Sequence, residues 1–206
     1  MHVESLFPTY LYHDIIPFDI DLQYLHGLDY EMYGCGTGHA SSNQLILEEE
    51  PFAELRKQID DAVNVLHYDV LQRSQGNPVL VQSWINNHNT GDHAPVHNHT
   101  NCYYSGIYYL NAPIDGGGLF FHHPELMRSK IIKVESHTYN KYNSELYFHE
   151  LKKNSLLIFP SHLPHSTEVN KSDQVRFSLA FNYFIEGQFG HQTSKINLRV
   201  VKRTLI

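Results

Sequence analysis

Short runs of β-branched and aromatic residues dominate the chain after Pro78, and they constrain its fold more than any other feature of the sequence. Runs of this composition, separated by turn-forming residues, are typical of β-strands. The seven predicted strands are Val79–Asn86, Tyr104–Leu110, Leu119–His122, Ile131–Val134, Leu146–Leu151, Ser155–Phe159 and Val175–Ile185. So many short strands favour a mainly β domain with flanking helices, a jelly roll or double-stranded β-helix of the cupin-like kind.

The residues before Pro78 predict a support for this β core. An apolar segment from Leu11 to Ile16 predicts a strand, and the loop that contains Gly34–Gly38 follows it. From Pro51 to about Arg73, apolar side chains recur at steps of three and four, which predicts one long helix with a buried stripe. Near the other end of the chain, Ile196–Val201 predicts an additional edge strand.

A chain of 206 residues is long enough for one domain with a substantial core. We therefore expect a single domain over residues 1–206. Residues 1–78 form its supporting part, residues 79–186 its jelly-roll core and residues 187–206 a C-terminal extension.

Charge and composition exclude several classes of function. The formal net charge of −7 and the lack of any block of five Lys or Arg residues argue against nucleic acid as a partner. No apolar stretch approaches the length of a membrane span, and the first residues do not resemble a signal peptide. With only Cys35 and Cys102 available, a disulfide framework is not expected. We expect a cytoplasmic protein, or one of the host cytoplasm if it is viral.

Histidines are the most unusual part of the composition, because their number, 16, exceeds the 15 Lys and Arg residues together. Such enrichment is typical of a metal-binding region, although a solvated loop can also hold it. His97 and His99 are two positions apart, so on an extended segment they point to the same side. His165, at the end of the segment Phe159–His165, can complete a triangle of ligands around one metal.

The last predicted strand separates two kinds of side chain. One face carries Phe177, Leu179, Phe181, Tyr183 and Ile185, and the other carries Arg176, Ser178, Ala180 and Asn182. Small side chains around one arginine leave room for a ligand, and the guanidinium pairs bidentately with a carboxylate. Arg176 could instead form an ordinary surface ion pair. The turn residues Lys171–Asp173 predict a hairpin that brings His165 and Arg176 to the same end.

Four elements in this order resemble a known family. They are the His97-Asn98-His99 pair, the Ser105–Leu110 strand, the Phe159–His165 segment and the Arg176–Asn182 strand. Together they resemble the 2-oxoglutarate- and Fe(II)-dependent dioxygenases, within them the oxygenases of phages and bacteria that are related to prolyl hydroxylases. The resemblance covers residues 79–186. It implies Fe(II) as the metal, 2-oxoglutarate and O₂ as cosubstrates, and hydroxylation of a peptidyl or free amino-acid side chain.

The resemblance also implies a role for particular residues. It assigns the metal to His97, His99 and His165 and the distal carboxylate of 2-oxoglutarate to Arg176, with a hydrogen bond from Tyr109. Asn182 is carried over as a polar group in the barrel interior that contacts the cosubstrate. A small-molecule cosubstrate is therefore expected as a partner, and a peptide or protein is a candidate substrate.

One position departs from the family's pattern, because most members have Asp or Glu where this chain has His99. A neutral ligand leaves one more positive charge at the metal, which favours a dianionic cosubstrate and alters the redox poise. Asp92, Glu168 and His93 are other candidates to complete the ligand set. For His122, His123 and His162 we expect positions at the rim, and for Trp84 a packing role.

Two functions from other classes stay open. A cupin-like protein could bind a metal or a small anion without oxidising anything, and three neutral imidazoles would also suit Zn²⁺ or Ni²⁺. A structural or assembly protein of a virus-like particle could reuse the same barrel. Arg176 discriminates among these classes, because a protein that binds only a metal does not need a guanidinium beside it.

Overall fold

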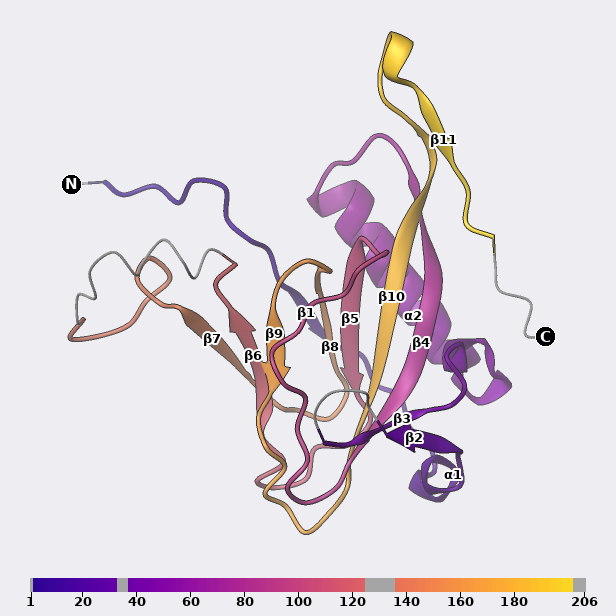
Figure 1. The fold of residues 1–206 in the computed structure, drawn as a ribbon, viewed down its shortest axis with the longest axis vertical. Helices are drawn as coiled ribbons and strands as arrows, with labels where there is room; N and C mark the ends of the chain where they lie inside the picture. The colour runs from indigo at the N-terminus through magenta and orange to yellow at the C-terminus, as the bar shows by residue number, and fades with distance from the viewer. Residues whose placement is uncertain (1, 33–36, 125–135, 202–206) are drawn as a thin grey trace.

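Two antiparallel β-sheets lie face to face in the computed structural model, which describes residues 2–32, 37–124 and 136–201 (Figure 1). The large sheet has the strand order β1 (Tyr12–Ile15), β8 (Ser155–Pro160), β5 (Tyr104–Tyr109), β10 (Arg176–Phe189), β4 (Asn77–His88), β3 (His39–Ser41) and β2 (Tyr30–Met32), and β11 (Ile196–Leu198) pairs with the end of β10. The small sheet has the order β7 (Leu146–Glu150), β6 (Gly118–His122) and β9 (His165–Thr167). The predicted jelly-roll fold is confirmed.

A helical segment covers one face of the large sheet (Figure 1). It consists of the 3₁₀ turns η1 (Ile46–Glu48) and η2 (Glu50–Phe52), the α-helix α2 (Ala53–Asn64) and the π-helical turn η3 (Val65–Val70). A short helix, α1 (Leu22–His26), and a 3₁₀ turn, η5 (Gln192–Ser194), lie elsewhere. The predicted long helix is therefore confirmed in position, with its last part wound more widely than an α-helix.

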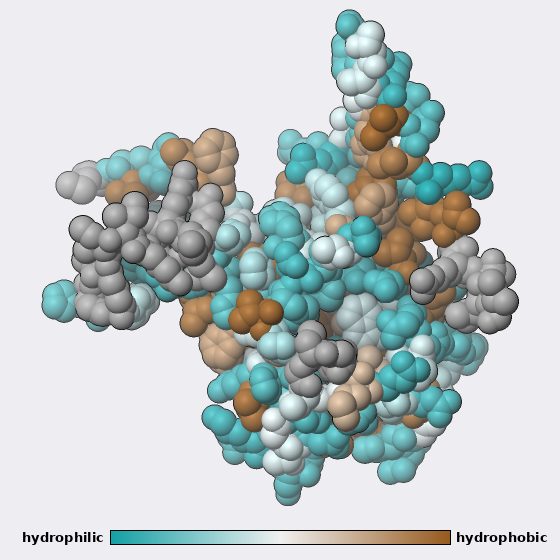
Figure 2. Space-filling view, viewed as in Figure 1, coloured by the Kyte–Doolittle hydropathy of each residue, from teal (hydrophilic) through white to brown (hydrophobic). Residues whose placement is uncertain are grey.

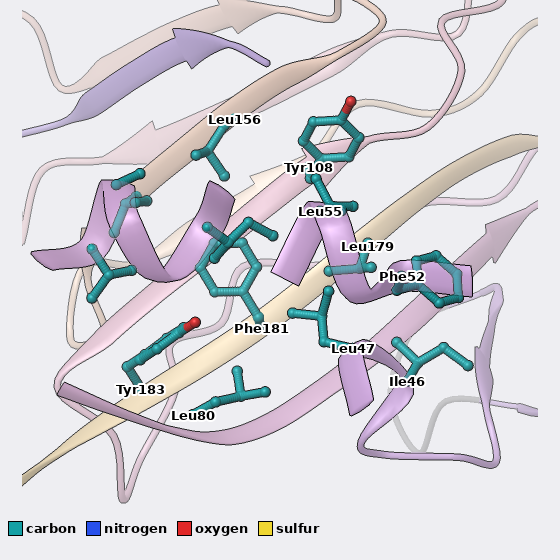
Figure 3. Close-up of a cluster of buried hydrophobic side chains, with 14 of the residues drawn as sticks. Ile46, Leu47, Phe52, Leu55, Leu80, Tyr108, Leu156, Leu179, Phe181 and Tyr183 are labelled. Atoms are coloured by element: carbon teal, nitrogen blue, oxygen red, sulfur yellow. The ribbon is translucent and has the colours of Figure 1, made fainter. Parts of the chain in front are cut away.

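The alternation of side chains on β10 divides the core in two. Its apolar face, which includes Phe177, Leu179 and Phe181, belongs to the cluster between the large sheet and the helices. Figure 3 shows Leu55 of α2 close to Leu179 and Phe181. A second cluster, which includes Leu119, lies between the two sheets. The opposite face of β10 turns toward this inner space, so the polar residues of that face lie between the sheets.

The predicted hairpin between His165 and Arg176 is wrong. Strand β9 pairs with β6 of the small sheet, whereas β10 pairs with β4 and β5 of the large sheet. The residues between them cross from one sheet to the other. Asn170 holds this crossing, because its side chain donates to the backbone oxygen of His88 and accepts from the backbone N–H of Ser172. The crossing nevertheless leaves the end of β9 beside the start of β10.

Other elements follow the prediction or depart from it in length. The tail strand is confirmed as β11, and β10 continues to Phe189. Strands β2, β3 and β9 and helix α1 were not predicted. The predicted strand at Ile131–Val134 and the residue Cys35 lie outside the described residues.

None of the described helices is long and apolar enough to cross a membrane. Figure 2 shows apolar surface on the β10–β11 ribbon, where Ile196 is 53% exposed.

Candidate metal centre

Three histidines converge in the space between the sheets. One ring nitrogen from each of His97, His99 and His165 lies within 4.8 Å of the others, and this is the only group of three potential metal ligands among the described residues. The ring centroids of His97 and His165 are 4.3 Å apart. The predicted ligands are therefore brought together from a loop after β4 and from the first residue of β9.

Backbone hydrogen bonds fix the loop that carries two of these ligands. His97 and His165 form an antiparallel bridge, and the backbone N–H of His99 donates to the oxygen of Ser161 over 3.0 Å. The loop therefore follows the edge of the small sheet as a further short strand would. This extended backbone places the side chains at positions 97 and 99 on one side, as the spacing predicts.

The ring nitrogens of two ligands have defined roles. Nδ1 of His97 lies 2.7 Å from the backbone oxygen of Pro95, and Nδ1 of His165 lies 2.9 Å from that of Leu163. A carbonyl oxygen only accepts, so Nδ1 of each ring carries the proton and donates it. Nε2 then keeps its lone pair, which is the arrangement that a metal requires.

Burial keeps the imidazoles of His165 and His99 uncharged. Together with the neighbouring His97 ring, it lowers the pKa of His165 to about 3 and that of His99 to about 4. A low-dielectric environment disfavours the protonated form, and two imidazolium ions side by side would repel each other. The neutral imidazole is the form that binds iron, nickel or zinc. The donor set therefore fits a transition metal.

A cavity of about 180 Å³ contains the three histidines. Its other lining residues are Trp84, Asn86, His88, Ala94, Pro95, Gly106, Ile107, Leu119, Phe159, Thr167 and Ala180. Most of them are apolar, so the space suits an organic ligand beside a metal. A larger cavity of about 420 Å³ lies beside η3, but His67 is the only histidine, cysteine or acidic residue that lines it. The chemistry therefore lies in the smaller cavity.

Arg176 lies directly behind two residues of the cavity wall. Its Nη2 donates to Nδ1 of His88 over 3.2 Å and to the hydroxyl of Thr167 over 3.1 Å. Its Nη1 donates to the backbone oxygens of Glu168 and Gly116. The side chain is only 1% exposed, so the alternative of a surface ion pair is wrong. Thr167 follows His165 by two residues on β9, which connects the guanidinium to the histidine cluster along one strand.

Tyr109 supplies a second buried polar group near the arginine. Within the part of the chain that the structure describes, its hydroxyl has no hydrogen-bond partner, although the residue is only 1% exposed. Burial raises the pKa of this phenol to about 12, and the positive charge of Arg176 opposes that rise. A buried hydroxyl without a partner is costly, so it fits a ligand that brings an acceptor.

Asn182 occupies a different environment from the other predicted site residues. Its side chain accepts from the hydroxyl of Ser105 over 2.7 Å and donates to Gln82 over 3.1 Å. The residues that line the cavity with the histidines do not include it. Its contact with the cosubstrate stays a prediction.

The alternative ligands lie outside the histidine cluster. The carboxylate of Asp92 accepts from the backbone N–H of Asn89, and that of Glu168 lies 3.8 Å from the ammonium of Lys171. The backbone N–H of His93 donates to the hydroxyl of Thr37, which also lies 3.4 Å from its ring. None of these three therefore completes the ligand set.

The residues that were expected at the rim or in packing have separate environments. The ring of His122 contacts the hydroxyl of Ser166, and His162 is exposed. Trp84 donates to Asn86 and lies 5.9 Å from the ring of His99, so it forms part of the cavity wall as well as packing.

Three parts of the arginine's surroundings were not predicted, namely His88, Thr167 and the glycines at 116–118. Gly117 has φ +81°, and a Cβ there would lie 3.2 Å from Nη1 of Arg176 and 2.9 Å from the side chain of Glu168. Glycine thus allows the backbone to pass close to the guanidinium. Three consecutive glycines before a strand were a signal for such an approach. The alternation Trp84, Asn86, His88 was a signal for a common face of β4.

Fold and site together define a jelly-roll protein with three histidine rings that converge in one cavity. Residues 82–182 match a protein-family model described as "Putative 2OG-Fe(II) oxygenase". This part of the chain, which carries the site, therefore resembles the 2OG-Fe(II) oxygenase family. The prediction of Fe(II), 2-oxoglutarate and O₂ is therefore confirmed at the level of the family. Within the family, assignment to the phage-like subgroup stays a prediction.

Several solved structures share the fold. HygX from Streptomyces hygroscopicus, solved with nickel and 2-oxoglutarate bound, has a TM-score of 0.58 at 15% identity, over 85% of this chain and 83% of that one. A prolyl-4-hydroxylase from Pseudomonas putida has a TM-score of 0.54 at 13% identity, over 81% and 82%. An oxidoreductase of the 2OG-Fe(II) oxygenase family from Burkholderia pseudomallei has a TM-score of 0.55 at 13% identity, over 79% of this chain and 75% of that one. No curated protein sequence matches this chain.

Proposed function

We propose that this protein is an Fe(II)- and 2-oxoglutarate-dependent dioxygenase that hydroxylates a peptidyl or free amino-acid side chain. The observation that carries the proposal is the cluster of His97, His99 and His165 in a cavity with Arg176 directly behind its wall. A metal site and a buried cation beside one cavity suit a cosubstrate that chelates the metal at one end and carries a carboxylate at the other.

The three histidines would hold the iron. When bound, iron and 2-oxoglutarate supply the oxidising chemistry, in which decarboxylation to succinate accompanies insertion of one oxygen atom of O₂ into a C–H bond. The protein contributes neutral imidazoles whose tautomers are fixed by the oxygens of Pro95 and Leu163. Because no ligand is a carboxylate, the metal keeps one more unit of positive charge, which favours binding of an anionic cosubstrate.

Arg176 and Tyr109 would hold the far carboxylate of 2-oxoglutarate. The guanidinium provides a fixed, buried positive charge beside the cavity, and the buried phenol provides a hydrogen-bond donor. Both groups are nearly inaccessible to solvent, so their interaction with an anion is stronger than it would be in water. Apolar side chains such as Ile107, Leu119 and Phe159 keep water away from the rest of the cavity.

The choice of an amino-acid side chain as the target rests on the likeness of this sequence to prolyl hydroxylases. A prolyl-4-hydroxylase is among the structures that share the fold. The alternative of a cupin-like protein that only binds a metal or an anion is not favoured, since the family match spans the strands that carry the site. The idea of an assembly protein is not favoured for the same reason.

Titration with Fe(II) and 2-oxoglutarate under anaerobic conditions tests the proposal. We expect the weak visible charge-transfer band of the chelate to appear, and succinate to be released when air is admitted in the presence of substrate or, more slowly, without it. His165→Ala should remove the band, while His162→Ala, a change at an exposed histidine, should keep it. The proposal would be rejected by the absence of a band with the unaltered protein, or by an unchanged band in both His165→Ala and Arg176→Ala.

A further inference from the structure

His88 and Arg176 are direct neighbours across two strands of the large sheet. The register pairs His88, the last residue of β4, with Arg176, the first residue of β10. Nη2 of the arginine lies 3.2 Å from Nδ1 of the histidine. His88 is 2% exposed and lines the cavity, whereas Arg176 lies behind the cavity wall. The histidine therefore borders both the cavity and the guanidinium.

The contact defines the state of the imidazole. Every N–H of a guanidinium is a donor, so Nδ1 of His88 must be the acceptor and cannot carry a proton. The ring is then neutral, with its proton on Nε2. Burial, together with the charge of Arg176, lowers the pKa of His88 to about 3, which agrees with this assignment. A neutral acceptor holds the arginine without cancelling the charge that attracts an anion.

Backbone packing fixes the ring of His88 from outside. Gly38, which is buried and has φ +118°, lies so close that a Cβ at this position would be 2.4 Å from Cδ2 and 2.9 Å from Nε2 of His88. The loop is held there by a bridge between Thr37 and His93. Only glycine combines this backbone conformation with such a close approach. The ring cannot move outward without moving this loop.

The arginine is enclosed in the same way on its other side. Its Nη1 donates to the backbone oxygens of Gly116 and Glu168, and its Nη2 also donates to Thr167. Gly117 again allows the chain to approach, because a Cβ there would lie 3.2 Å from Nη1. Backbone oxygens thus restrain one end of the guanidinium, while the side chains of His88 and Thr167 restrain the end that faces the cavity wall.

We infer that His88 is a positioning residue for the cosubstrate: it orients the guanidinium of Arg176, and Gly38 holds its ring in place for that purpose. The inference rests on the proposed function for its consequence, which is tight binding of 2-oxoglutarate. The contact between the two side chains exists in the free protein and is independent of that function. An arginine that is oriented in advance loses less conformational entropy when its ligand binds.

The experiment compares His88→Phe with His88→Asn in the full-length protein. Phenylalanine keeps a ring of similar size and removes the acceptor, whereas the amide oxygen of asparagine can replace Nδ1. Loss of a hydrogen bond to a charged group predicts a dissociation constant for 2-oxoglutarate about tenfold higher in His88→Phe. The dissociation constant of Fe(II) should stay unchanged, and His88→Asn should recover most of the loss. Gly38→Ala, which displaces the ring without removing it, should weaken 2-oxoglutarate binding in the same direction.

A second readout needs no cosubstrate. In ¹⁵N-edited NMR spectra of the free protein, the side-chain N–H signals of Arg176 should be sharp and protected from solvent exchange, and His88→Phe should broaden or shift them. His162→Phe is the control, because it changes an exposed histidine away from the guanidinium. Unchanged Arg176 signals in His88→Phe would overturn the inference, as would equal losses of Fe(II) and 2-oxoglutarate affinity. If the unaltered protein binds no 2-oxoglutarate, the proposed function fails, and the NMR comparison still decides the role of His88.

Discussion

The backbones of His97 and His165 are joined by two reciprocal hydrogen bonds. The N–H of His97 donates to the oxygen of His165 over 2.9 Å, and the N–H of His165 donates to the oxygen of His97 over 2.8 Å. Two side chains that are 68 residues apart are thus held as a pair before any metal binds. His99 is attached differently, through its own N–H to Ser161. The third ligand can therefore be exchanged without disturbing the pair.

The variant His99→Asp tests what a third neutral ligand does. It restores the carboxylate that most of the family has at this position, and we expect Fe(II) still to bind. The aspartate cancels one positive charge at the metal, so the dissociation constant of 2-oxoglutarate should rise several-fold, on the order of 1 kcal/mol. Metal and cosubstrate titrations by calorimetry measure both constants. Tighter binding of 2-oxoglutarate in the variant would contradict this account of the charge.

Substitution of Arg176 by lysine separates charge from geometry. Lysine keeps the positive charge but loses the planar set of donors, so 2-oxoglutarate should bind at least about tenfold more weakly while Fe(II) binds as before. Arg56→Lys, at a helix surface where the arginine pairs with Asp60, is the control and should change neither constant. Parallel loss of both affinities in Arg176→Lys would mean that the arginine supports the fold instead of the cosubstrate.

The parts of the fold that the sequence predicts are those in which local composition and burial agree. Strands β5 and β8 are buried along their whole length and consist largely of apolar or aromatic residues, so their composition alone predicts them. Strands β2, β3 and β9 have three residues each and include Glu31, His39 and Ser166. Such strands exist because a neighbouring strand pairs with them, and local sequence does not show which neighbour that is.

Local sequence likewise predicts only part of the site. The spacing of His97 and His99 is local, so it predicts their common direction, and a family resemblance supplied His165. The contact between His88 and Arg176 depends on the register between β4 and β10, which no local pattern reveals. The hairpin prediction failed because the turn residues Lys171–Asp173 lie in a crossing between two sheets. Turn chemistry predicts a change of direction, but it does not predict the sheet in which the next strand pairs.

Acid should destabilise the metal-free protein at a higher pH than the pH at which protonation of its carboxylates would unfold it. Burial lowers the pKa values of His165, His88 and His99 to about 3, 3 and 4 from the ordinary value of 6.5. Between pH 6.5 and about 4 the unfolded chain therefore binds more protons than the folded chain. The free energy of unfolding should fall as the pH falls through this window, and it should be insensitive to these histidines above about pH 7.5.

Urea unfolding of the metal-free protein at pH 7.5, 6 and 5 measures this effect. The midpoint should decrease at each step, and His165→Gln, which cannot titrate, should show a smaller decrease than the unaltered protein. His162→Gln removes an exposed histidine and should follow the unaltered protein. A midpoint that rises on acidification would show that these imidazoles are protonated in the folded state, which is incompatible with a preformed metal site.

Tyr109 and Tyr108 offer the sharpest comparison, because they are neighbours on β5 that face opposite sides of the sheet. The hydroxyl of Tyr108 lies within hydrogen-bond distance of two acceptors, the backbone oxygen of Ile16 and the side chain of Asn154, whereas that of Tyr109 has no partner among the described residues. Removal of an unsatisfied buried hydroxyl is stabilising or neutral, so Tyr109→Phe should leave the free energy of unfolding unchanged or raise it by about 1 kcal/mol. It should also weaken 2-oxoglutarate binding about tenfold, because the proposed ligand loses a donor.

Tyr108→Phe should do the reverse, since it removes a hydroxyl that donates its proton in the core beneath the helices, and it touches no part of the cavity. We expect it to lower the free energy of unfolding by about 1–3 kcal/mol and to leave the 2-oxoglutarate affinity of the folded protein as it was. Urea unfolding gives the free energy of unfolding of each variant, and calorimetric titration gives the dissociation constant of 2-oxoglutarate for each. If Tyr109→Phe is the destabilised variant and binds 2-oxoglutarate normally, the hydroxyl has a partner within the protein, and the carboxylate must be held by Arg176 without it.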